Sequence, residues 1–254
     1  MRNNIVAGNW KMNMTYKEGR VLASNIIDMS MCEVTSSTQI LLIPPFPHIE
    51  TLTGLSKNIP NISVGAQDCS NKEKGAYTGE VSASILKSFG VTHVVIGHSE
   101  RRQYFRESNK LLASKVFISI QSGLIPIYCC GESSEIRNAG KHFNLIKEQI
   151  EGGLFSLPSN DVLKTIIAYE PVWAIGSGIS ASVGQAQEMH AYIRDIIKRK
   201  FGEEVSSTIS ILYGGSLRPS NSKELFACDD IDGGLVGGAS LIPRDFVDIA
   251  KSFM

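Results

Sequence analysis

Short runs of apolar and β-branched residues recur along the chain, and segments with helical periodicity lie between them. The runs lack the alternation of a half-exposed strand, so each predicts a strand covered on both faces, as in a parallel sheet. The eight runs span residues 5–7, 40–43, 62–65, 93–96, 125–129, 165–169, 209–213 and 233–236. Residues 182–200 are typical of the connecting segments, because Met189, Ile193, Ile196 and Ile197 form one apolar stripe and the last turn is basic.

The number of strand–helix units predicts the architecture. Eight units in 254 residues are typical of a single-domain (β/α)8 barrel, in which eight parallel strands lie inside a ring of helices. The alternative is an open, doubly wound sheet, which normally has a G-x-G-x-x-G turn after its first strand. Here the first run leads into Gly8-Asn9-Trp10-Lys11, which lacks that turn. No Pro- or Ser-rich linker divides the chain, so we predict one domain over residues 1–254.

Composition and charge narrow the classes of partner. The chain is 43% hydrophobic and 20% charged, as in ordinary globular proteins. Its 25 Lys and Arg residues balance 25 Asp and Glu residues, which favours neither nucleic acid nor an anionic membrane as a partner. The five cysteines form no C-x-x-C pair, so we predict neither a disulfide framework nor a structural zinc site. From the sequence we expect neither a signal peptide nor a membrane span, and we expect a cytoplasmic protein.

Ionisable or polarising side chains follow four of the predicted strands. Barrel enzymes collect their active-site residues at the carboxyl ends of the strands. Lys11 follows the first strand, His98 the fourth, Glu132 the fifth and Glu170 the sixth. Each has an ordinary structural alternative, namely a solvated lysine, a capping or core histidine, or a carboxylate in an ion pair. The combination favours an active site.

The environment of two of these residues suggests acid–base chemistry. Glu170 lies between IIAY and PVW. Partial burial there would raise its pKa and make it a base toward a C–H proton. His98 precedes Ser99, which can cap a helix. Helix N–H groups beside the imidazole would keep the ring neutral, as a hydrogen-bond donor. Lys11 lies two residues after Asn9, where its ammonium would attract a phosphate or an oxyanion.

Three glycine-rich stretches occur later in the chain, at residues 176–178, 214–216 and 237–240. Glycine lets the backbone approach an anion closely and direct several N–H groups toward it. The last two stretches follow the seventh and eighth strands, where many barrels bind phosphate with the N-terminus of a short helix. Residues 237–241 can form that helical turn. Each stretch alone is also ordinary turn chemistry, but the two positions together favour a phosphorylated ligand.

Seven motifs along the whole chain resemble, in order, those of the triosephosphate isomerase family. They are GNWKMN (8–13), GAYTGEVS (75–82), VIGHSERR (95–102), CCGE (129–132), AYEPVWAIGSG (168–178), YGGS (213–216) and LVGGASL (235–241). The resemblance implies an isomerase that interconverts dihydroxyacetone phosphate and D-glyceraldehyde 3-phosphate through an enediol(ate). It also implies that no metal or organic cofactor is needed. Another sugar-phosphate barrel enzyme and a non-catalytic phosphate-binding barrel remain the alternatives.

The resemblance also implies roles for individual residues. Glu170 would be the base and His98 the neutral electrophile, the arrangement established for this family. Lys11 and Asn9 would bind the substrate and the enediolate oxygen, and Glu100 would pair with the lysine. The phosphate would be held, mostly by backbone N–H groups, by Gly176, Ser216, Gly237 and Gly238.

Two loops are expected to move or to bind a second subunit. The segment 171–182 would be a lid over the site. It departs from the family pattern because residues 177, 179, 180 and 182 are Ser, Ile, Ser and Ser, where Thr, a basic residue, Thr and Thr are usual. The loop from Gly75 to Glu80, with Thr78 at its centre, resembles the loop that inserts into the neighbouring subunit near Asn9 and Lys11. The resemblance therefore implies a homodimer.

Overall fold

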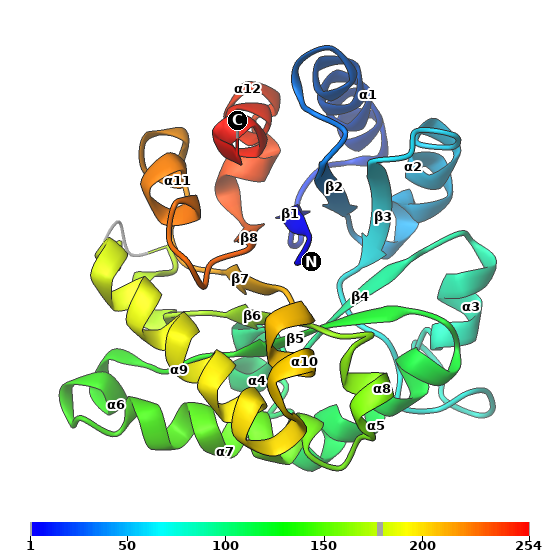
Figure 1. Cartoon of the computed structure of the whole chain (residues 1–254). Coiled ribbons are helices and arrows are strands. Elements are labelled where there is room, and N and C mark those ends of the chain that lie inside the picture. Colours follow the sequence, from blue (N-terminus) through cyan, green and yellow to red (C-terminus); the bar gives the residue numbers. More distant parts are fainter. Residues whose placement is uncertain (1, 177–179, 254) are drawn as a thin grey trace.

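The structure is a computed structural model that describes residues 2–176 and 180–253. Within these residues, eight strands close into a barrel in which each strand pairs with the next along the chain and β8 pairs with β1 (Figure 1). All pairs are parallel. The strands are β1 (Asn4–Asn9), β2 (Thr38–Ile43), β3 (Ile62–Ala66), β4 (His93–Ile96), β5 (Ile125–Cys130), β6 (Ile166–Tyr169), β7 (Ile211–Tyr213) and β8 (Gly233–Val236). The predicted fold is confirmed, and no predicted strand end is wrong by more than two residues.

Helices surround the barrel and connect its strands (Figure 1). The α-helices are α1 (Tyr16–Glu33), α2 (Ile49–Leu55), α3 (Ala83–Ser88), α4 (Ser99–Tyr104), α5 (Asn109–Gln121), α6 (Ser134–Asn138), α7 (His142–Leu154), α8 (Ser159–Val162), α9 (Val183–Phe201), α10 (Glu203–Thr208), α11 (Pro219–Phe226) and α12 (Pro243–Ala250). The short 3-10 helices are η1 (Phe46–His48), η2 (Val172–Ala174), η3 (Gly238–Leu241) and η4 (Lys251–Phe253). Within the described part of the chain, no helix is long and apolar enough to cross a membrane.

The core has two layers, which explains why the strands lack polar alternation. Ile5 and Ala7 of β1 belong to the cluster inside the barrel, while Val6 belongs to the cluster between the strands and the helices. Successive side chains of a strand point to opposite faces, so both faces of β1 are apolar. The helix predicted over residues 182–200 supplies part of the outer layer, since the four residues of its apolar stripe are all buried.

Closure of the barrel depends on a glycine at the start of β8. Gly233 has a φ of 143° and pairs with Ile5 of β1. A Cβ atom at position 233 would lie 1.8 Å from the carbonyl oxygen of Ile5, so any larger residue would push the first and last strands apart. The closed ring brings the carboxyl ends of all eight strands to one mouth, where the chemistry-bearing residues meet.

Candidate active site

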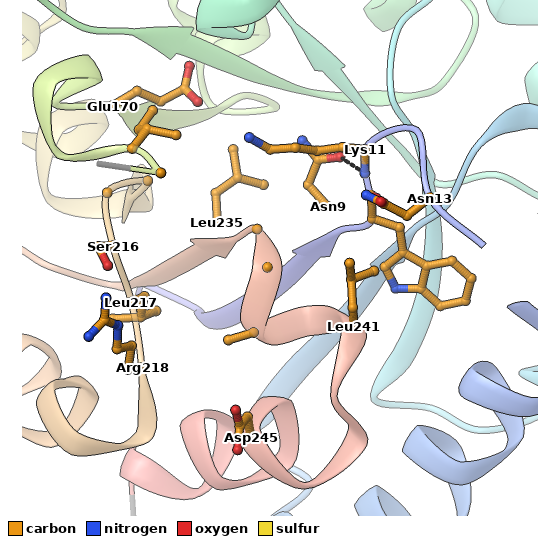
Figure 2. A pocket seen from close by; sticks show the side chains of 18 of the residues that line it. Asn9, Lys11, Asn13, Glu170, Ser216, Leu217, Arg218, Leu235, Leu241 and Asp245 are labelled. Carbon is orange, nitrogen blue, oxygen red and sulfur yellow. Dashed lines mark hydrogen bonds between the residues drawn. The ribbon is translucent and has the colours of Figure 1, made fainter. Parts of the chain in front are cut away.

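A cavity of about 500 Å³ lies at this mouth. Figure 2 shows the Lys11 side chain extended across it in the direction of Glu170, with Ser216 and Arg218 further along the wall. Of the nine residues to which the resemblance assigns a role, eight line the cavity: Asn9, Lys11, His98, Glu170, Gly176, Ser216, Gly237 and Gly238. The ninth, Glu100, is bound to one of them, because its Oε1 lies 2.6 Å from Nζ of Lys11.

Glu170 directly follows β6 and is only 1% exposed. Its Oε1 lies 3.0 Å from Nε2 of His98, and its Oε2 accepts a 2.8 Å hydrogen bond from the N–H group of Ser99. The backbone is also held, since the Glu170 N–H group donates to the carbonyl oxygen of Cys130 at 2.7 Å. Next to it, a Cβ at Gly131 would lie 1.8 Å from the Glu170 carbonyl oxygen, so only glycine fits there. The carboxylate is therefore held between His98 and the N–H group of Ser99.

The pKa of Glu170 differs from the sequence-based expectation. Burial raises it, as expected, but His98 and the Ser99 N–H group stabilise the carboxylate by more, so the net shift of the pKa is downward. The expectation of a raised pKa is therefore wrong for the protein without a ligand. The physical reason is a hydrogen-bonded partner that is distant in sequence and adjacent only because β4 and β6 both end at the mouth.

His98 itself caps α4, so the expectation that Ser99 would be the cap is wrong by one residue. Its Nδ1 accepts a hydrogen bond from the Glu100 N–H group at 3.2 Å. A nitrogen that accepts carries no proton, so the ring proton belongs on Nε2, which can donate to Glu170. This geometry favours the neutral ring that the sequence predicts.

The charges around His98 act in the opposite direction. Burial lowers the pKa of the imidazole, but the carboxylates of Glu170 and Glu100 raise it by more, so the net shift is upward. In the protein without a ligand, the capping hydrogen bond thus favours the neutral ring while the nearby carboxylates favour the charged one. The protonation of His98 depends on how close the Glu170 carboxylate remains.

Lys11 lies on a turn that is held in an unusual conformation. Its φ of 53° is in the left-handed region, which costs free energy for a residue with a side chain. The Lys11 N–H group donates to Oδ1 of Asn9 at 3.0 Å, and Nε2 of Gln67 donates to the Lys11 carbonyl oxygen at 2.8 Å. These hydrogen bonds and the ion pair with Glu100 position the ammonium group at the cavity.

The remaining wall consists largely of backbone. The predicted turn after β8 is present as η3, which begins at Gly238 with Gly237 as its cap. The first N–H groups of a helix have no partner within it and can bind an anion. Gly176 contributes to the same cavity from the segment predicted to be the lid. Ser177, Gly178 and Ile179 of that segment lie outside the described residues, so the lid stays a prediction.

Not every ionisable strand end belongs to this site. Glu132, which follows β5, does not line the cavity, and it is fully buried. Its Oε1 accepts hydrogen bonds from Arg137, the Tyr169 hydroxyl and Nε1 of Trp173. Because Trp173 is one of the first residues of the predicted lid, these contacts tie Glu132 to the start of that segment and indicate a structural role.

Several residues of the cavity wall were not predicted from the sequence. Among them are Asn13, Arg218 and Asp245. Asn13 ends the GNWKMN motif, and Arg218 follows Ser216 by two positions, so proximity to a recognised motif was the available signal. Asp245 offered no such signal, because it lies inside α12. The described residues contain no group of three or more His, Cys, Asp and Glu side chains that could hold a metal ion.

Comparison with known proteins agrees with the motifs. The family model described as triosephosphate isomerase matches residues 4–253. The chain is 52% identical over 254 residues to a triosephosphate isomerase of Cytophaga hutchinsonii, with all of both chains covered. It is 49% identical over 253 residues to that of Porphyromonas gingivalis, with 100% of each covered, and 43% identical over 252 residues to that of Flavobacterium johnsoniae, with 99% and 100% covered. The chain therefore belongs to the triosephosphate isomerase family of enzymes.

Proposed function

We propose that this isomerase interconverts dihydroxyacetone phosphate and D-glyceraldehyde 3-phosphate through an enediol(ate), with Glu170 as the base and His98 as the electrophile. The observation that carries the proposal is the contact between the Glu170 carboxylate and the His98 imidazole in one cavity with Lys11. The glycine-rich wall of that cavity supplies a second feature that the substrate requires, a site for its phosphate.

The reaction moves one proton between adjacent carbons. Glu170 takes the proton from the carbon beside the carbonyl group, and negative charge develops on the carbonyl oxygen. Nε2–H of His98 and the ammonium group of Lys11 stabilise that charge, with Asn9 assisting. Glu170 then returns a proton to the neighbouring carbon, so the enzyme ends unchanged. A positioned base contributes about 10²–10⁴-fold and each oxyanion donor about 10²–10³-fold, which together reach roughly 10⁶–10¹⁰.

Substrate binding also accounts for a neutral His98. To reach a substrate carbon, the Glu170 carboxylate has to leave Nε2 of His98, which is 3.0 Å away in the unliganded protein. That movement removes the main contact that raises the pKa of the imidazole. Burial and the Glu100 N–H group remain and favour the neutral ring, while the Glu100 carboxylate also remains and favours the charged one. A neutral imidazole can act as the electrophile, because its N–H group donates a hydrogen bond to the oxygen on which the negative charge develops.

Turnover by the purified chain tests this proposal. With D-glyceraldehyde 3-phosphate as substrate we expect a kcat/KM of about 10⁴–10⁸ M⁻¹s⁻¹, the range of efficient enzymes. Addition of a metal chelator should leave the rate unchanged. A protein that binds inorganic phosphate at this cavity but turns over no triose phosphate would contradict the proposal and would instead be a phosphate-binding barrel.

We further propose that the protein acts as a homodimer in the cytoplasm. The loop at residues 75–80 is exposed throughout and has positive φ values at Gly75 and Gly79, which supports a protruding turn able to reach a second subunit. We expect Thr78→Arg to lower both the mass in sedimentation and the turnover. Ser36→Arg, at another exposed position, is the matched control and should change neither. A Thr78→Arg monomer with full activity would contradict the dimer proposal.

A further inference from the structure

Glu170 separates two cavities. Besides the active-site cavity, the structure has a cavity of about 450 Å³ on the α4 and α6 side of the barrel mouth, which we call the rear cavity. Among the described residues, Glu170 is the only one in the walls of both. The rear cavity is lined by Ser99, Arg102, Gln103, Gly131, Ser133, Ser134, Glu135, Gln149, Glu170 and Val172. The catalytic base therefore forms a partition between them.

The rear cavity is large enough for several water molecules. Several of its lining residues carry polar side chains, although most of the surface that faces the cavity is apolar. A water molecule occupies about 30 Å³ and needs two to four polar partners. Gln103, Ser134 and Glu135 are exposed, so the cavity opens to bulk solvent. Ser133 and Gln149 lie deeper. The Gln149 amide is bonded to the backbone of Gly131, whereas the Ser133 hydroxyl accepts from the Ile136 N–H group and can still donate to water.

Each carboxylate oxygen of Glu170 bonds to a different wall. Oε1 contacts His98, a residue of the active-site cavity, while Oε2 accepts from Ser99, a residue of the rear cavity. During turnover the active-site cavity holds the substrate and its phosphate, which block the approach of water to the base from that side. The rear cavity lies on the other side of Glu170 from the substrate.

From this arrangement we infer that the rear cavity is the route by which protonated Glu170 exchanges its proton with solvent during the isomerisation. The inference rests on the proposed function. After Glu170 has taken the substrate proton, it is a neutral carboxylic acid. Its O–H proton passes to a water molecule in the rear cavity, and a proton from the same chain of water returns to the carboxylate. The enediol(ate) is untouched, so the only result is that Glu170 now carries a hydrogen from solvent.

The origin of the hydrogen in the product measures this exchange. When isomerisation runs in D₂O, a product molecule with protium received the proton that Glu170 had taken from the substrate. A product molecule with deuterium received a deuteron that Glu170 had acquired from solvent by exchange. ¹H NMR of the product gives the ratio of the two. We expect Ser134→Trp and Gln103→Trp, which fill the rear cavity from α6 and α4 respectively, to raise the ratio of protium to deuterium about threefold or more.

Turnover should be almost unaffected in these variants, because neither residue lines the active-site cavity, and we expect kcat/KM to stay within about twofold. Asn138→Trp is the matched control, since Asn138 is exposed and ends α6 but does not line the rear cavity. Its isotope ratio should equal that of the unaltered protein. Ser134→Ala widens the opening and should not raise the ratio.

The outcomes separate the two proposals. An unaltered protein without isomerase activity would overturn the proposed function itself. An active protein whose isotope ratio is the same in Ser134→Trp, Gln103→Trp and Asn138→Trp would overturn only the rear route and would place the exchange on the active-site side. Because the two filling variants lie on different helices, one that fails to fold leaves the other to decide.

Discussion

The two sides of the active-site cavity are built in different ways. On one side Glu170 and His98 are side chains that are 1% and 6% exposed, and they contact each other and the backbone of α4. On the other side, the proposed phosphate site consists of Gly176, Ser216 and the start of η3, where Gly176 is exposed and Ser216 is half-buried. The Glu170–His98 pair is therefore buried and hydrogen-bonded, while the other side is more accessible to solvent.

This difference follows from what each side has to do. Proton transfer depends on distances defined to a fraction of an ångström, so its groups need specific hydrogen-bond partners that orient them. Binding a phosphate needs several donors of similar strength, and backbone N–H groups at a helix start provide them. We expect substitutions on the first side to change kcat strongly, and those on the second to act mainly on binding and on the fate of the intermediate.

The largest effect is expected for Glu170→Gln. The amide keeps the shape but cannot take a proton, so kcat should fall by about 10²-fold or more, with little change in the affinity for inorganic phosphate. Glu148→Gln, which removes an exposed carboxylate from α7, is the control and should be fully active. Steady-state kinetics and phosphate titration provide both numbers. Undiminished turnover in the Glu170 variant would mean that another group is the base.

Deletion of residues 175–178 should have a smaller effect on rate and a distinct effect on products. The deletion removes Gly176 and leaves Glu170 and His98 in place. We expect isomerisation to slow by about tenfold or more, because the phosphate is less well positioned. We also expect the enediol(ate) to lose phosphate, which yields methylglyoxal. Both products can be followed by NMR. If the variant folds and isomerises more slowly but releases no additional phosphate per turnover, this segment does not guard the intermediate.

The smallest effect is expected for Ser216→Ala. If the phosphate is held mostly by backbone N–H groups, loss of one hydroxyl removes a single hydrogen bond, worth about 0.5–1.5 kcal/mol. KM should therefore rise by about two- to tenfold with kcat nearly unchanged. A fall in kcat as large as that of Glu170→Gln would show that the two sides of the cavity do not differ as described.

The fold was predictable from the sequence because it depends on local patterns. Both faces of β1 are apolar, and the stripe of α9 repeats with helical period, so each is visible in a short window of sequence. The lining of the cavity by Glu170 and His98 was predictable for a related reason, since each follows a strand and strand ends meet at the mouth.

The energetics of the site were less predictable because they depend on contacts between distant residues. The lowered pKa of Glu170 requires His98 and Ser99, which come from another strand–helix unit. Similarly, Glu132 resembled an active-site carboxylate in the sequence, yet it binds Arg137 and Trp173 outside the cavity. A pattern of residues gives the place of a side chain along the chain but not the direction in which it points.

We propose that substrate binding separates Glu170 from His98 and leaves the imidazole neutral. ¹⁵N NMR of His98, recorded against pH without and with a bound enediolate analogue, tests this claim. Without ligand, we expect the pKa of His98 to lie above its usual value of about 6.5, because Glu170 is in contact. With the analogue bound, Nδ1 should remain unprotonated throughout the pH range of activity. A His98 that is protonated on both nitrogens in that complex, or that titrates near 6.5 in it, would contradict the claim.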